Sequence, residues 1–152
     1  MKNRNGMYFV LMAILLVGCG DDLEVEDPLS GAVQDREWEF ADGHALPKED
    51  GEEGETVEIM LSDQSLQTCE EIEEDGTYVA FEVPPKVGVH EDVPVDFVFV
   101  EGFDFGFSGT TDTVEITRVE DSIIFGELEV STEGTDLEND IAGEFAAHLC
   151  GR

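Results

Sequence analysis

The sequence predicts one all-β domain, either a single antiparallel β-sandwich or a small barrel of seven to eight strands. Three observations predict this class. Apolar and polar residues alternate with a period of two through most of the chain after residue 30, glycine-rich or acidic turns separate the alternating segments, and a helical pattern occurs in one short segment. With 152 residues, of which 41% are apolar, the chain is long and apolar enough to bury a core.

Seven segments alternate clearly enough to predict a strand in each. They are residues 32–40, 56–62, 76–83, 93–100, 113–119, 122–130 and 140–150. Their apolar faces carry Trp38 and Phe40; Val57, Ile59 and Leu61; Val79, Phe81 and Val83; Val93, Val95, Phe97 and Phe99; Val114 and Ile116; Ile124, Leu128 and Val130; and Ile141, Phe145, Ala147 and Leu149. Because alternate residues of a strand point to the same face, these side chains form the predicted core.

One short helical segment is predicted near residues 62–76, "SDQSLQTCEEIEEDG". Ser62 or Asp63 can cap its first turn, and a glycine can end it. Because the segment carries Cys69, we expect it over a sheet edge near Cys150.

The segment "FVFVEGFDFGFSG", residues 97–109, is rich in phenylalanine. Either its Glu-Gly dipeptide is a two-residue hairpin turn that pairs Val100 with Phe103, or the glycine bulges a continuous strand. In both cases Phe103, Phe105 and Phe107 share a face. That face is either core or an exposed aromatic strip for a ligand or partner. These three residues are therefore the candidate ligand-binding residues.

The chain is strongly acidic, with 38 Asp and Glu against seven Lys and Arg, a net charge of −31. Such a field repels nucleic acid, because binding phosphate needs clustered cations, so we expect no nucleic-acid partner. The acidic residues are spread along the chain. They form either a solvated acidic surface or a surface that collects divalent cations or docks a basic partner.

Calcium is the cation that such a surface suits best, since it binds six to eight oxygen atoms. The candidate ligands are Asp136, Glu138, Asn139 and Asp140, and the acidic residues of segment 50–55 are a second possibility. Neither set follows the ligand order of an EF-hand loop. We therefore predict no specific metal site, and calcium binding stays an alternative.

No catalytic motif is present in the sequence. His44, His90 and His148 lie in different segments and form none of the HxH, HxxxH or HExxH spacings that place two imidazoles on one metal. The serine motif GxSxG and the phosphate-binding loops GxGxxG and GxxxxGK[ST] are also absent. With 38 acidic residues, some carboxylate pair meets any catalytic distance by chance. No catalytic residue and no cofactor are predicted.

The N-terminus has the pattern of an exported protein. The first six residues are basic, residues 7–17 form an uncharged run too short to span a bilayer, and Leu16-Val17-Gly18-Cys19 ends the pattern. This box resembles the lipobox of bacterial lipoproteins. The resemblance implies diacylglycerol on the Cys19 thiol, cleavage after Gly18 and acylation of the new amine, and two or more acyl chains anchor a protein stably. The alternatives are an ordinary signal peptide or an uncleaved anchor.

The resemblance implies three parts: a cleaved signal peptide (1–18), a lipidated acidic tether (19–30) and a β domain (31–152). The partner would be a membrane, reached through the lipid on Cys19. Gly20 differs from the aspartate that resembles an inner-membrane retention signal in enteric bacteria. The expected place is therefore the bacterial outer membrane, on either face.

If Cys19 carries lipid, Cys69 and Cys150 are the two cysteines that remain. Exported chains fold in an oxidising compartment, so we expect a Cys69–Cys150 disulfide. The alternatives are a metal site, for which there is no CxxC spacing, or reactive thiols, which would need a basic neighbour.

The phrases "SGAVQDREWEF" and "IAGEFAAHLC" resemble the first and last strands of small uncharacterised bacterial lipoproteins with β domains. That group implies no activity. The sequence as a whole favours a lipid-anchored envelope protein that acts as a non-enzymatic structural, interaction or ligand-binding module. The alternatives are a hydrolase or other enzyme that uses dispersed carboxylates, or a calcium-binding surface module.

Overall fold

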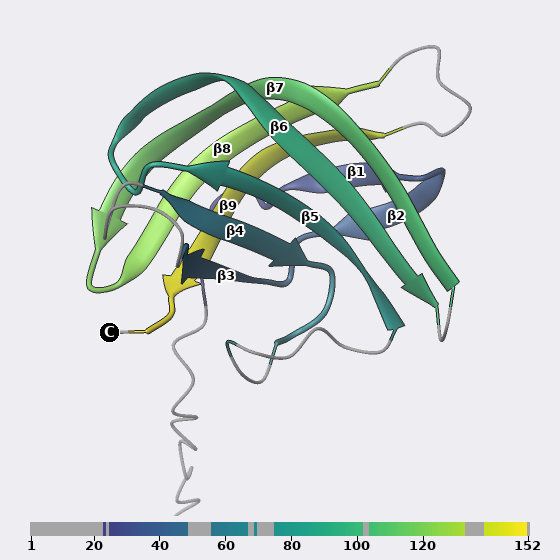
Figure 1. Cartoon of the computed structure of the whole chain (residues 1–152), viewed down its shortest axis with the longest axis horizontal. Helices are drawn as coiled ribbons and strands as arrows, with labels where there is room; N and C mark the ends of the chain where they lie inside the picture. The colour runs from purple at the N-terminus through teal and green to yellow at the C-terminus, as the bar shows by residue number, and fades with distance from the viewer. Residues whose placement is uncertain are drawn as a thin grey trace, which may run out of the picture.

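The computed structural model describes residues 23, 25–48, 56–66, 69, 75–101, 104–132 and 139–151. Every regular element in this part of the chain is a β-strand, which confirms the predicted all-β class (Figure 1). The strands are β1 (Ser30–Val33), β2 (Arg36–Glu39), β3 (Asp42–Pro47), β4 (Val57–Ser62), β5 (Asp75–Val83), β6 (Gly88–Glu101), β7 (Asp104–Glu120), β8 (Ile123–Ser131) and β9 (Asp140–Leu149).

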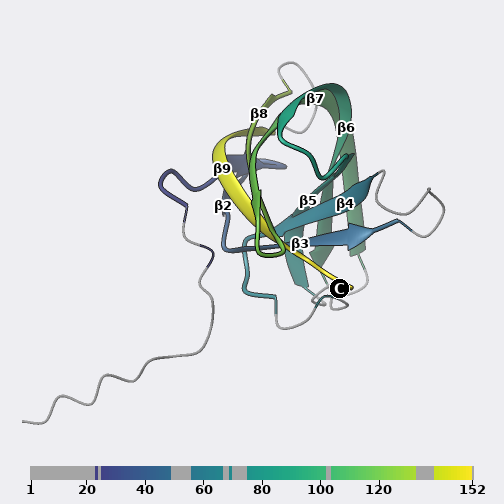
Figure 2. The ribbon, with the colours of Figure 1, turned by 90° about the vertical axis from the view of Figure 1, so that its left-hand side faces the viewer.

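Strands β3 to β9 close into a seven-stranded barrel (Figures 1 and 2). β3 to β8 neighbour one another in chain order and pair antiparallel. β9 then pairs antiparallel with β8 and parallel with β3, where His44 lies opposite His148 and Ala45 opposite Leu149. Of the two predicted architectures the barrel is observed, and its β3–β9 joint makes it a mixed barrel.

The hairpin β1–β2 lies outside this ring and covers part of its core (Figure 1). β1 pairs antiparallel with β2 and with the first residues of β9. Trp38 Nε1–H donates a hydrogen bond to the backbone oxygen of Thr77 in β5 at 3.0 Å. The guanidinium of Arg36 lies 3.9 Å from the ring centroid of Phe99 in β6. The hairpin therefore pairs with β9 and, through two side chains of β2, contacts β5 and β6.

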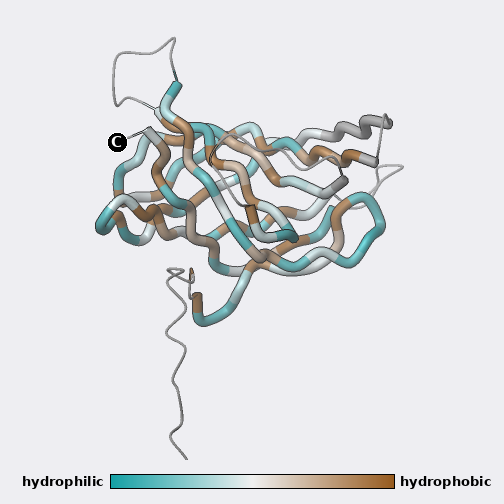
Figure 3. Tube along the Cα trace, turned by 90° about the horizontal axis from the view of Figure 1, so that it is seen from below, coloured by the Kyte–Doolittle hydropathy of each residue, from teal (hydrophilic) through white to brown (hydrophobic). Residues whose placement is uncertain are grey.

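Alternating hydropathy along the strands builds the barrel core (Figure 3). All the predicted core residues are at most 7% exposed except Phe99 and Leu149, which are half-buried. The rings of Phe81 and Phe145 meet edge to face, with centroids 5.5 Å apart. Gly126 makes room for this packing, because a Cβ there would lie 2.5 Å from the Phe145 ring.

Two expectations about the first strands are corrected by the structure. The predicted strand 32–40 is a hairpin, because Gln34 and Asp35 have positive φ angles of 50° and 62° and turn the chain. Strand β3 was not predicted at all. One of its buried positions is Gly43, where a Cβ would lie 2.4 Å from the backbone oxygen of Ala146, so this close packing requires glycine. Because glycine has no apolar side chain, the buried face of this strand does not show as an alternation of apolar and polar residues.

The predicted helical segment 62–76 is wrong at both ends. Ser62 is the last residue of β4, and β5 begins at Asp75. The Ser62 hydroxyl does accept a hydrogen bond from the N–H of Gln64, at 3.0 Å, but its backbone stays in the sheet and binds Ala41. Sheet pairing therefore overrides the capping signal. Residues 63–66 form no helix, and Cys69 apart, the rest of the segment up to residue 74 lies outside the described residues.

The phenylalanine-rich segment forms a hairpin, the first of its two predicted alternatives. Its register differs from the prediction, because Glu101 pairs with Asp104 and Val100 pairs with Phe105 rather than Phe103. This register sets Phe97 opposite Ser108 and Phe99 opposite Gly106.

Three glutamates lie side by side on the outer face of β7, β8 and β9. The register places Glu115 opposite Glu127, and Glu127 opposite Glu144. Glu115 and Glu127 are exposed and Glu144 is half-buried. Like charges directly opposite each other destabilise a sheet, and dissolved salt screens them. This glutamate row therefore lowers the stability of the barrel at low ionic strength.

Replacing the middle glutamate is expected to stabilise the protein. Glu127→Gln removes both like-charge pairs and keeps the side-chain shape, so it should raise the free energy of unfolding by about 0.2–1 kcal/mol at low salt. The gain should shrink in about 0.5 M NaCl, where the charges are screened. Thermal denaturation at both salt concentrations measures it. Glu129→Gln is the matched control, because Glu129 is exposed on the same strand but lies opposite Ala142. Equal gains from both variants would assign the effect to net charge and not to the row.

Candidate functional site

The segment before β1 packs against the barrel. Leu29 is fully buried, and Leu23 and Val25 are half-buried against the same core. The Leu29 N–H donates to the Glu144 backbone oxygen and the Glu144 N–H donates to the Asp27 oxygen, both at 2.7 Å. The described part of the expected tether, residues 19–30, is therefore attached to β9 and belongs to the domain.

Gly143 permits this close approach. Its φ of +137° is one that other residues rarely adopt, and a Cβ there would lie 2.8 Å from both the Asp27 oxygen and the Leu29 Cα. The segment is also held by the side chain of Glu144, whose Oε2 accepts a hydrogen bond from the Glu26 N–H at 3.0 Å.

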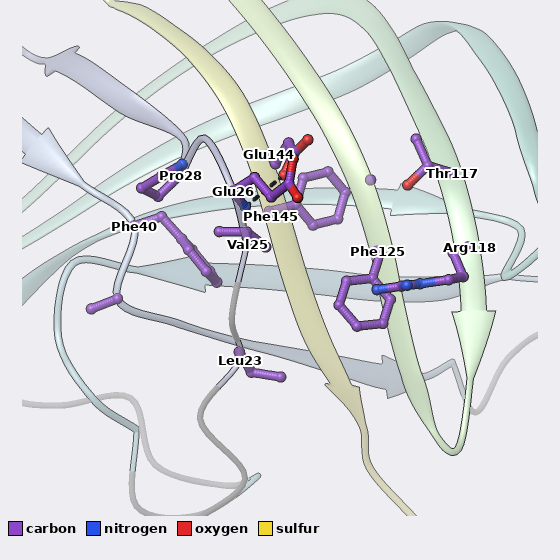
Figure 4. Close-up of a pocket in the computed structure, with 12 residues that line it drawn as sticks. Leu23, Val25, Glu26, Pro28, Phe40, Thr117, Arg118, Phe125, Glu144 and Phe145 are labelled. Atoms are coloured by element: carbon purple, nitrogen blue, oxygen red, sulfur yellow. Dashed lines mark hydrogen bonds between the residues drawn. The ribbon is translucent and has the colours of Figure 1, made fainter.

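A groove of about 880 Å³ lies between this segment, the end of β7, the start of β8 and the middle of β9 (Figure 4). We call it the N-terminal groove. Its lining residues are Leu23, Val25, Glu26, Pro28, Phe40, Ala41, Thr117, Arg118, Phe125, Gly126, Glu144 and Phe145. In Figure 4 the segment with Leu23 and Val25 lies on one side of β9, and Phe125 with Arg118 lies on the other.

A β-bulge shapes the far wall of the groove. Ile116 pairs with Gly126 and Arg118 pairs with Phe125, so Thr117 is an extra residue in β7. The bulge brings Arg118 opposite Phe125, and the guanidinium lies 3.8 Å from the ring centroid. This cation–π contact holds the two side chains together at the groove wall.

The groove combines apolar surface with charge of both signs. Phe40 and Phe125 provide aromatic surface, and the carboxylates of Glu26 and Glu144 lie together on the side of the segment (Figure 4). Arg118 contributes a positive charge on the other side, where it also lies 3.6 Å from Glu120. Such a lining suits a ligand with an apolar part and a charged group.

The two candidate ligand-binding phenylalanines that the structure describes take strand positions away from this groove. Phe105 and Phe107 take positions in β7 opposite Val100 and Val98, at the hairpin with β6, and Phe103 lies outside the described residues.

Of the calcium candidates, the structure describes Asn139 and Asp140. Asn139 is buried and its Oδ1 accepts a hydrogen bond from the Gln34 N–H at 2.9 Å, so its amide fixes the β1–β2 turn. Asp140 is exposed at the start of β9. Asp136 and Glu138, like segment 50–55, lie outside the described residues.

The predicted disulfide between Cys69 and Cys150 is confirmed. It joins residues 81 positions apart, with Cα atoms 5.9 Å apart, and fixes the end of β9 to the connection between β4 and β5. In the chain-entropy model a loop of this length stabilises the fold by about 4 kcal/mol.

His44 lies beside the disulfide. A ring nitrogen of His44 and the two sulfur atoms lie within 4.8 Å of one another. Burial lowers the pKa of His44, the carboxylate of Asp42 acts in the opposite direction, and His148 adds to the lowering. The rings of His44 and His148 lie 6.5 Å apart, because the parallel pairing of β3 with β9 sets the two residues opposite each other.

Neither the packing of residues 23–29 against the barrel nor the position of His44 beside the disulfide was predicted from the sequence, and the reasons differ. The period-two text "LEVEDPL", with Leu23, Val25 and Leu29 between acidic residues, carried a signal for a packed segment. His44 had no such signal, because its neighbours Cys69 and Cys150 are distant in sequence and the strand that carries it was not predicted.

Comparison of the chain with protein-family models, curated proteins and solved structures finds no match. In the part of the chain that the structure describes, no helix is long and apolar enough to cross a membrane.

The environment of His44 makes stability depend on pH. Because its pKa is lowered in the folded protein, the unfolded chain binds a proton at higher pH, and stability falls as pH drops below about 6.5. His44→Gln should therefore lose less stability than the wild type between about pH 7 and pH 5, as measured by urea denaturation at each pH. His90→Gln, at the start of β6, is the control and should follow the wild type. An unchanged pH dependence in His44→Gln would contradict the assignment.

Proposed function

We propose that the protein is a lipid-anchored protein of the bacterial envelope whose barrel is a non-enzymatic binding module, with the N-terminal groove as its ligand site. The groove is the observation that carries the proposal, because its walls combine aromatic and charged side chains.

The proposed anchor would hold this groove close to a membrane. Cys19, which ends the lipobox-like sequence, stands four positions before Leu23 in the groove wall. Four residues span at most about 14 Å, so a lipid on Cys19 would place the groove near the headgroups. The outer membrane is the proposed place.

The charge of the chain favours a cationic ligand. The net charge of −31 attracts cations, and Glu26 and Glu144 present carboxylates at the groove. Phe125 offers apolar ring surface on the opposite wall, where the Arg118 guanidinium lies over one of its faces. An amphipathic ligand with an apolar chain and a positive group fits this combination.

The anchor is tested by the mass of the mature N-terminal peptide from the full chain made in a Gram-negative host. We expect a diacylglyceryl group on Cys19 and cleavage after Gly18. Cys19→Ser should leave the membrane fraction, while the Cys69→Ser, Cys150→Ser double variant should stay in it. An unmodified Cys19 in the mature protein would refute the anchor.

The groove is tested by titration with decyltrimethylammonium below its micelle concentration, followed by calorimetry. Phe125→Ala should weaken binding about tenfold, or 1.4 kcal/mol, because it removes aromatic surface at the groove wall. Val89→Ala is the control, since Val89 is an exposed apolar residue that lies outside the N-terminal groove, in the lining of a second groove. Equal affinity of both variants, or tighter binding of decyl sulfate, would contradict the proposal.

A further inference from the structure

We infer that His44, Cys69 and Cys150 form a zinc site when the disulfide is reduced, so that the disulfide and the metal are alternative links at one place. The ligand atoms of the three residues already lie within 4.8 Å of one another. This inference is independent of the N-terminal groove and of its ligand.

Two of the three donors are fixed by the sheet and not by the disulfide. His44 is held in β3 by pairing with β4 on one side and with β9 on the other. Cys150 follows β9, and its N–H donates to the backbone oxygen of Ala45 at 2.9 Å. Reduction therefore leaves His44 and Cys150 adjacent, and Cys69, which lies outside the strands, is the donor that has to move.

The donor set matches the chemistry of zinc. Zinc binds thiolate sulfur at about 2.3 Å and imidazole nitrogen at about 2.0–2.1 Å, which sets its tetrahedral ligands about 3.3–3.8 Å apart. The sulfur atoms need to separate only from bonding distance to this spacing. A water molecule completes the tetrahedron, as in zinc sites with three protein ligands.

His44 is suited to its role as the nitrogen ligand. It is 7% exposed, and burial lowers its pKa, which favours the neutral imidazole whose ring nitrogen has a lone pair for the metal. Of the groups that face it, Asp42 on the same strand favours the protonated ring, and His148 on β9 opposes it.

The change of state is a thiol–disulfide exchange with a dithiol as reductant. A thiolate of the dithiol attacks the Cys69 sulfur, which is half-buried, and Cys150, 4% exposed, leaves as thiolate. The second thiol of the reductant then releases Cys69 as thiolate and becomes part of a disulfide in the reductant, and the two cysteine thiolates take up the protons that the thiols of the reductant lose. Binding of Zn²⁺ displaces the two protons of the cysteine thiols, which leaves both cysteines as thiolates on the metal.

The bound metal would keep the link that reduction removes. The disulfide fixes the end of β9 to Cys69, and a zinc ion bridging Cys69, Cys150 and His44 connects the same segments and adds β3. Zinc should therefore raise the melting temperature of the reduced protein.

The test is a Co²⁺ and Zn²⁺ titration of the full mature chain, oxidised and after reduction with a phosphine. Cobalt is read by its thiolate charge-transfer band, which the many surface carboxylates do not produce. We expect one equivalent of this band in the reduced protein, its loss on adding one equivalent of Zn²⁺, and no band in the oxidised protein.

The variants distinguish metal binding by the three proposed ligands from metal binding by the acidic surface. Cys69→Ser and Cys150→Ser should each weaken binding strongly, and His44→Gln should weaken it about tenfold or more, while His90→Gln should match the wild type. Each variant is checked for its strand signal by circular dichroism, and His44→Gln is folded with its disulfide intact before reduction. A reduced wild type without the band, or a reduced His44→Gln with wild-type affinity, would overturn the inference.

Discussion

Strand β9 is the constraint on which the other features of the barrel depend. One of its edges pairs with β8 along the strand, and the other edge binds, in order, β1, the segment at Asp27–Leu29 and β3. These contacts close the ring, attach the N-terminal segment that walls the groove, and bring Cys150 beside β3. Two glycines make the close approaches possible, Gly143 towards the N-terminal segment and Gly43 towards β9.

The strands of the barrel wall could be predicted from the sequence, because the alternation of apolar and polar residues indicates which face of a strand is buried. Segment 56–62, for example, carries Val57, Ile59 and Leu61 at every second position, and the structure buries all three. Alternation does not report how strands are connected or which edges meet. The turn at Gln34 and Asp35, the register at Glu101 and the strand β3 therefore needed the structure.

The candidate sites could be predicted far less well, because each combines parts of the chain that are distant in sequence. The disulfide followed from counting cysteines once Cys19 was set aside, but nothing in the spacing placed His44 next to it. That neighbour depends on a parallel joint between the third strand and the last. The groove likewise depends on a bulge at Thr117 and on a segment expected to be a spacer.

The attachment of the N-terminal segment to β9 has a mechanical consequence. If Cys19 is anchored in a membrane as proposed, a force that pulls the domain away from it enters the fold at Leu23 and reaches β9 through the backbone hydrogen bonds of Asp27 and Leu29 with Glu144. The far end of the same strand is linked covalently to Cys69. Strand β9 thus takes up the force at Glu144 and is linked by the disulfide where it ends. The tension is therefore resisted by the barrel wall, and the small β1–β2 hairpin does not detach first.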